Sequence, residues 1–139
     1  MKIKKFDNSL VVRLDIGDEI CECIRVCCEE YGVKLASVSG IGVTESAVVG
    51  LYDLEKREFI ANEINTFMEI ASLTGNVTTM NGEIYVHLHA VLCDKNSIAF
   101  GGHLKKGVIG ATGEIFINIV NGETGRYNDK KTGLNILDI

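Results

Sequence analysis

The stretch that decides the fold is Glu83-Ile-Tyr-Val-His-Leu-His-Ala-Val-Leu-Cys93 followed by Ser97-Ile-Ala-Phe-Gly-Gly-His-Leu104. Successive side chains of a β-strand point to opposite faces of the sheet. In the first segment every even-numbered position from 84 to 92 is apolar, so His87 and His89 share the opposite face. The second segment repeats this parity and adds His103 to the histidine face. The expected core row consists of Ile84, Val86, Leu88, Ala90, Leu92, Ile98 and Phe100.

The turn between the two segments follows from the same pattern. Directly paired residues of antiparallel strands project to the same side, so core-facing residues must pair with each other. A two-residue loop would place the two apolar rows on opposite faces, unless a bulge intervened. A three-residue loop over 95–97 keeps the rows together and sets His89 against His103. A bulge at Gly101-Gly102 would shift this register, and glycine there also leaves room for a neighbouring side chain or ligand.

His87, His89 and His103 are therefore candidate metal ligands. Two imidazoles on one strand and a third across the ladder offer three nitrogens on a firm backbone. Zinc is the first expectation, because imidazole suits it and three histidines leave a fourth tetrahedral position for water or substrate. Nickel, copper and iron stay open. The alternative is that the three histidines are half-exposed residues that face a subunit interface.

A helix is predicted over Asp18–Tyr31, with Asp18 as its N-cap and Gly32 closing it. Its apolar residues form one stripe, to which Cys27 and Cys28 belong. The chain has 5 cysteines, an odd number, and we expect no secretory signal, so we expect reduced thiols. Four of them follow the spacing Cys-x-Cys-x3-Cys-Cys, which is not a standard zinc pattern. We therefore expect Cys27 and Cys28 to be small core residues, with Cys21 and Cys23 at the two edges of the apolar stripe.

Most of the remaining chain has the alternation and turn signals of strands. Gly40-Ile41-Gly42 lacks the third glycine and following helix of a dinucleotide-binding loop, and it is interpreted as a turn. One helix and many strands predict an α+β fold, a largely antiparallel β-sheet with one main helix packed on it. We expect residues 1–139 to form a single domain. The expected strands are 10–16, 34–39, 47–52, 59–62, 67–75, 83–93, 97–104 and 111–120.

Composition narrows the classes of function. Of the 139 residues 46% are hydrophobic and 24% charged, which excludes a disordered chain. No apolar run approaches the roughly 18 residues needed to cross a bilayer, so we expect a cytoplasmic protein with no membrane association. The net charge of −5 argues against strong unaided nucleic-acid binding. A local basic patch is left as an alternative. Its residues would be Lys2, Lys4, Lys5, Lys105, Lys106, Arg126, Lys130 and Lys131.

Two further residues are candidates for a role in catalysis. Glu114 lies on the even-numbered face of 111–120 and could serve as a general base or support a metal ligand. Arg13 interrupts an apolar run and could contact an anion. The alternatives are that Glu114 is a surface carboxylate and Arg13 an outward residue of an alternating strand.

Several motifs together resemble the plants and prokaryotes conserved (PPC) family, whose members are often called DNA-binding proteins. The combination His-x-His with Gly-Gly-His-Leu at this distance is specific, and the resemblance covers nearly the whole chain. The matching segments are Arg13-Leu-Asp-Ile-Gly-Asp-Glu-Ile20, Ser39-Gly-Ile-Gly42, Met68-Glu-Ile-Ala-Ser-Leu-Thr-Gly-Asn76, His87-Leu-His89, Gly101-Gly-His-Leu104 and Gly113-Glu-Ile115.

The resemblance implies a helix-backed antiparallel sheet that assembles as a homotrimer, with the three matched histidines as metal ligands. In plants, related domains accompany AT-hook segments that contact the minor groove. This chain has no Pro and so lacks the Arg-Gly-Arg-Pro core of an AT-hook.

Three hypotheses follow. The first is a homotrimeric protein that binds a divalent metal, zinc in the first instance, in a small-molecule or regulatory role. The second is a DNA-binding or architectural protein that acts through gathered basic patches. The third is a metal-dependent hydrolase or lyase that uses the open position of the three-histidine site.

Overall fold

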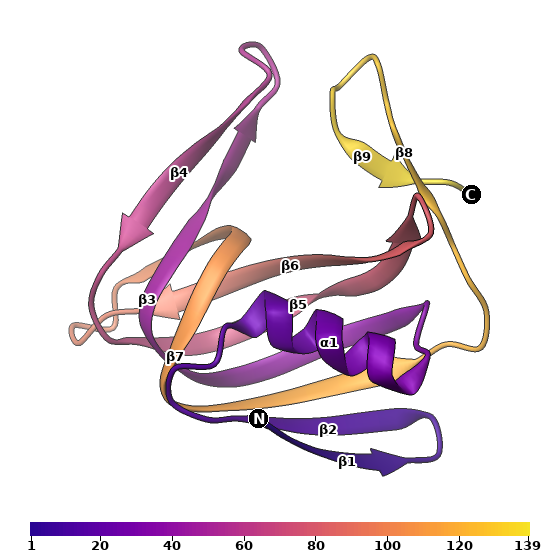
Figure 1. Ribbon diagram of the computed structural model, residues 1–139. Coiled ribbons are helices and arrows are strands. Elements are labelled where there is room, and N and C mark those ends of the chain that lie inside the picture. The colour runs from indigo at the N-terminus through magenta and orange to yellow at the C-terminus, as the bar shows by residue number, and fades with distance from the viewer.

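A computed structural model describes all residues from 1 to 139 (Figure 1). One helix, α1 (Ile20–Tyr31), lies against a large antiparallel sheet, which confirms the predicted α+β class. Two short strands, β8 (Arg126–Asn128) and β9 (Asn135–Leu137), form a separate hairpin, here called the C-terminal arm. The main sheet contains β1 (Lys2–Phe6), β2 (Ser9–Leu14), β3 (Ala36–Asp53), β4 (Glu58–Ile64), β5 (Met68–Met80), β6 (Glu83–Cys93) and β7 (Ala99–Ile119).

The main sheet has the strand order β1-β2-β7-β6-β5-β3-β4, and its neighbouring strands are antiparallel. An additional pairing joins β3 to β7. The strands β3, β5, β6 and β7 therefore form a closed ring in which each has a partner on both sides. Figure 1 shows α1 lying along this ring. The buried residues of the helix and the strands form one hydrophobic core between them.

The helix begins one residue later than predicted, because Glu19 and not Asp18 supplies the N-cap. The Glu19 carboxylate accepts the backbone N–H of Glu22 at 2.7 Å and that of Gly107 on β7 at 2.9 Å. One side chain thus caps the helix and ties it to the sheet. Gly32 closes the helix with φ 66°, as predicted. The core face carries the expected residues Ile20, Ile24, Cys27 and Cys28.

With 12 residues, α1 is too short and not apolar enough to span a membrane.

Two pairs of expected strands are each one long strand. Segments 34–39 and 47–52 join within β3, and 97–104 and 111–120 join within β7. The prediction of a turn at Gly40-Ile41-Gly42 is therefore wrong. The pairing of β3 shifts register there, as in a β-bulge, which bends a strand without ending it. The strands β1, β8 and β9 were not expected.

The β6–β7 hairpin has the predicted register. His89 pairs with His103, and the N–H of Asp94 donates to the carbonyl of Ile98 at 3.0 Å across the three-residue loop. The expected core positions of Ile98 and Phe100 are wrong, because these side chains are 55% and 46% exposed. Figure 1 shows the reason, since the end of the hairpin extends beyond α1.

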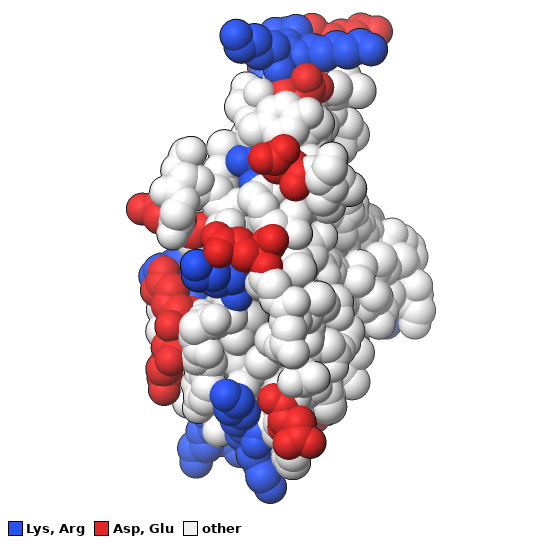
Figure 2. Space-filling view, turned by 90° about the vertical axis from the view of Figure 1, so that its right-hand side faces the viewer, with Lys and Arg blue, Asp and Glu red and all other residues white.

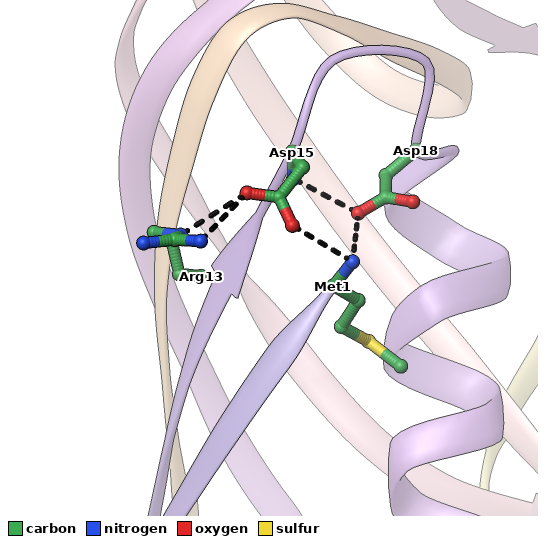
Figure 3. Close-up of polar contacts among 4 residues, drawn as sticks. All are labelled: Met1, Arg13, Asp15 and Asp18. Carbon is green, nitrogen blue, oxygen red and sulfur yellow. Dashed lines mark hydrogen bonds and ion pairs between the residues drawn. The ribbon is translucent and has the colours of Figure 1, made fainter.

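An ion-pair cluster joins the start of β1 to the loop that precedes α1 (Figure 3). The Met1 ammonium lies 2.7 Å from Asp18 Oδ2 and 3.2 Å from Asp15 Oδ2. Asp18 Oδ2 also accepts the backbone N–H of Asp15 at 2.9 Å. The hydrogen bond from Met1 lowers the pKa of Asp18, and the same contact raises the pKa of the ammonium. The cluster therefore stabilises the folded chain at pH values between these two pKa values.

We expect Asp18→Asn to lower the free energy of unfolding by about 1 kcal/mol near neutral pH, because a partly exposed charged contact is lost. The contribution is complete above the ordinary pKa of 3.8 and disappears as the pH falls through the lowered pKa of the folded state. It also declines as the pH rises through the raised pKa of Met1, which lies above 8.0.

Urea unfolding at pH 7 and at about pH 2 measures this difference. Asp7→Asn is the matched control, because Asp7 is exposed and its side chain makes no hydrogen bond or ion pair. An equal deficit of Asp18→Asn at both pH values would contradict the assignment.

Candidate metal centre

The pairing of β6 with β7 gathers the three histidines on one side of the sheet. His89 and His103 are direct partners, and His87 lies two positions from His89 on the same face of β6. The alternate residues Leu88 and Ala90 are buried in the core. One ligand nitrogen from each histidine lies within 4.8 Å of the other two.

The three imidazole rings form a nearly equilateral triangle. Their centroids are separated by 5.3 Å between His87 and His89, 5.1 Å between His87 and His103, and 5.8 Å between His89 and His103. A tetrahedral zinc ion holds its ligand nitrogens about 3.3 Å apart. Small side-chain rotations close the remaining difference, so the three histidines fit a metal ion of this size.

The environment of His87 and His103 keeps these two imidazoles neutral. Burial lowers the pKa of His87 to about 4, and the nearby Arg126 guanidinium and the other two histidines act in the same direction. Burial, followed by the proximity of His89, also lowers the pKa of His103. A metal ligand needs the free lone pair of a neutral ring, so these shifts favour metal binding over protonation at neutral pH.

The strand β3 supports His103 from its other side. His103 pairs with Gly50 of β3, and the edge of the Phe59 ring from β4 packs against its imidazole with centroids 5.7 Å apart. A Cβ atom at Gly102 would lie only 2.4 Å from the carbonyl oxygen of Gly50. Glycine at this position therefore makes room for the β3 backbone, and the register of the β6–β7 pairing continues through it without a bulge.

A fourth side chain beside the histidines comes from the C-terminal arm. Arg126 Nη2 lies 3.5 Å from Nδ1 of His87 and donates to Asn76 Oδ1 at 2.8 Å. Asn76 pairs directly with His87. A two-residue turn at Asn81-Gly82, between β5 and β6, is enough to predict this pairing from the sequence. No sequence signal indicates that Arg126 lies beside the histidines. The sequence groups it only with the lysines of the local basic patch.

The two candidate catalytic residues lie outside the three-histidine cluster. Glu114 is exposed further along β7, where it pairs with Arg13 of β2 and Ile41 of β3. Arg13 forms an ion pair with Asp15 at 3.0 Å, within the cluster of Figure 3. The structure thus places Glu114 and Arg13 next to each other. Neither residue belongs to the three-histidine cluster.

The cysteines do not form a second metal site. All five are free thiols, and no group of cysteines with metal-binding proximity exists. Burial raises the pKa of Cys21 and Cys28 to about 12 and that of Cys27 to about 11. These thiols are therefore protonated at neutral pH, and the prediction that Cys27 and Cys28 belong to the core is confirmed.

A groove of about 620 Å³ lies beside the end of the β6–β7 hairpin. Its two charged side chains, Glu63 and Asp94, are both acidic. None of the three histidines lines it. The groove is therefore separate from the three-histidine cluster. Its walls are Val49, Asn62, Glu63, Ile64, Asn65, Thr66, Met68, Asp94, Phe100 and Gly101.

Solved structures share this fold over almost the whole chain. A metal-containing protein from Archaeoglobus fulgidus is 35% identical, with a TM-score of 0.87 and 98% of each chain covered. A candidate DNA-binding protein from Bacteroides thetaiotaomicron is 28% identical, with a TM-score of 0.95 and coverage of 99% of this chain and 96% of that one. A plant- and prokaryote-conserved (PPC) protein from Pyrococcus horikoshii is 27% identical, with a TM-score of 0.87 and coverage of 99% and 94%.

Family comparison agrees with the motifs. No curated protein matches the sequence. The family model for the Plants and Prokaryotes Conserved (PCC) domain matches residues 1–121, which include all three histidines and end before Arg126. The resemblance inferred from the sequence is confirmed, and the chain belongs to the Plants and Prokaryotes Conserved domain family.

Proposed function

We propose that this protein binds a divalent metal ion, zinc in the first instance, through His87, His89 and His103. The observation that carries the proposal is the convergence of three imidazoles whose ligand nitrogens lie within 4.8 Å of one another. Burial keeps the pKa of His87 and His103 low, so their lone pairs are free at neutral pH. The similar protein from Archaeoglobus fulgidus is called metal-containing, which supports the proposal.

Three histidine ligands suit a site that exchanges its fourth ligand. A tetrahedral ion held by three protein nitrogens keeps one position for water or a small molecule. The cluster contains no Asp, Glu or Cys. We therefore assign the site to small-molecule binding or regulation. A hydrolytic role would need a general base from outside the cluster, and Glu114 lies elsewhere on β7.

We expect protein purified without nickel resin or chelator to contain about one zinc per chain, and His103→Ala to lose that metal because two histidines hold zinc weakly. Elemental analysis combined with protein quantification measures the ratio. Thr74→Ala is the matched control, because Thr74 pairs with His89 on the adjacent strand, is exposed and is not a ligand.

An undiminished metal content in His103→Ala would remove the proposal. So would wild-type protein that takes up no zinc, cobalt or nickel after dialysis against each metal.

We further propose that the chain assembles as a homotrimer. The number three comes from the family resemblance. Support for self-association comes from large apolar side chains that are exposed on the single chain, which soluble monomers seldom expose as connected areas. They lie on two paired segments, with Leu51 opposite Ile60 on β3 and β4 and with Ile98 and Phe100 at the end of the β6–β7 hairpin.

Light scattering is expected to give a mass of about three times the 15.2 kDa chain, and Phe100→Asp to lower it, because a charge in an apolar interface is costly. Ile16→Asp is the control, because Ile16 is exposed in the loop before α1. A wild-type monomer would contradict the trimer, and an intact Phe100→Asp trimer would remove Phe100 from the interface.

DNA association is the second candidate function, because one similar structure is called a candidate DNA-binding protein and Lys105 and Lys106 are exposed on β7. Against it, the net charge is −5, and Figure 2 shows a face on which basic and acidic groups alternate between broad uncharged areas. We expect duplex DNA to show no retardation at low salt. Salt-sensitive retardation that Lys105→Glu/Lys106→Glu weakens would favour the DNA function instead.

A further inference from the structure

We propose that Arg126 and the metal centre together form a binding site for a small carboxylate, whose one oxygen occupies the open metal position while the other accepts from Arg126. This inference rests on the proposed metal site and names the class of ligand that it takes. Three observations carry it, together with one chemical consequence of metal binding. The observations are the fixed orientation of the guanidinium, its lack of a counter-ion and its contact with His87. The consequence is that a bound metal would remove the acceptor of that contact.

Arg126 is held in place by neutral groups from three elements. Its Nε donates to Thr78 Oγ1 at 2.8 Å, its Nη2 to Asn76 Oδ1 at 2.8 Å and its Nη1 to the carbonyl of Asn135 at 2.7 Å. The guanidinium also stacks on the Tyr85 ring at 4.8 Å from the centroid. These contacts fix the plane of the guanidinium and with it the directions of all its N–H groups.

No carboxylate neutralises this arginine. Arg13 pairs with Asp15 and Arg25 pairs with Glu22 and Glu29, whereas Arg126 has no ion pair although it is half-buried. A cation withdrawn from water without a counter-charge is unfavourable. The site therefore favours an anion next to the histidines.

A metal ion on His87 removes an acceptor from Arg126. A guanidinium only donates hydrogen bonds, so the 3.5 Å contact with His87 requires a lone pair on Nδ1. A metal on Nδ1 uses that lone pair, and a metal on Nε2 moves the ring proton to Nδ1. In either case the Arg126 N–H that lies beside His87 loses its acceptor.

A second N–H of Arg126 is also free. Of its five N–H donors, four enter the contacts with Asn76, Thr78, His87 and Asn135, which leaves one on Nη1 without an acceptor. The carboxylate oxygen that is not on the metal can accept from these two donors. A carboxylate on the open metal position thus satisfies the metal, the orphaned donors and the unpaired charge together.

The competing explanation is that Arg126 only anchors the C-terminal arm through Asn135. Figure 1 shows the arm standing beside the ends of β5 and β6. Arg57 also holds the arm, donating from Nη2 to the carbonyls of Lys130 and Lys131 at 3.2 Å each. Arg57→Gln therefore loosens the same arm and leaves Arg126 unchanged, which makes it the matched control.

The test is a titration of the cobalt(II)-loaded protein with acetate, followed through the visible absorption of the metal. We expect acetate to change the spectrum of the wild type with saturation, and acetamide, its neutral counterpart, to have no such effect. Arg126→Gln is expected to bind one cobalt per chain and to weaken acetate binding at least 10-fold, since it removes a charged donor. Arg57→Gln is expected to retain the wild-type acetate affinity.

Equal acetate affinity in wild type and Arg126→Gln, or an equal loss in Arg126→Gln and Arg57→Gln, would overturn this inference while leaving the metal site intact. Failure of the wild type to bind cobalt would instead overturn the proposed function. If Arg126→Gln does not fold, Arg126→Lys replaces it, because lysine keeps the charge and lacks the forked donors. Unchanged acetate affinity in Arg126→Lys would then overturn the inference.

Discussion

The pairing of His89 with His103 across the β6–β7 hairpin is the contact on which the candidate site depends. Leu88, Ala90 and Leu92 are fully or almost fully buried on the opposite face of β6. A slip of one residue would turn this row toward solvent, and each exposed leucine would cost about 2 kcal/mol of hydrophobic stabilisation. The packing of the core therefore holds the hairpin in the register that gathers the imidazoles. The site gains its rigidity from the same interaction that stabilises the fold.

Long bent strands bring the other parts of the site to this hairpin. The β3 backbone passes so close to β7 that Gly102 has no room for a side chain, and His103 is therefore enclosed by β3 and β4. On the far side, β5 supplies Asn76 opposite His87, and the C-terminal arm supplies Arg126. The three histidines proposed as metal ligands and an unpaired cation thus meet at one place, which is an arrangement suited to a small anionic ligand.

Much of this arrangement was predictable from sequence, because strand alternation and turn length are local properties. These properties predict the pairing of His89 with His103, the helix, and the burial of Cys27 and Cys28. The errors have physical causes. Glycine marks both turns and bulges, so Gly40 and Gly42 were interpreted as a chain reversal. Parity identifies the face of Phe100 but not whether another element covers it. Arg126 reaches the histidines only through tertiary packing, in a segment without strand periodicity and outside the residues matched by the family model.

The most direct test of the central claim is X-ray absorption spectroscopy at the zinc edge of protein purified without added metal. Zinc held by the three histidines is expected to give imidazole scattering from three nitrogen ligands at about 2.0 Å, with one further light atom in the remaining position. Sulfur scattering at about 2.3 Å would assign the metal to the cysteines of α1. That result, or a protein that holds no zinc after incubation with it, would contradict the assignment of His87, His89 and His103 as the metal centre.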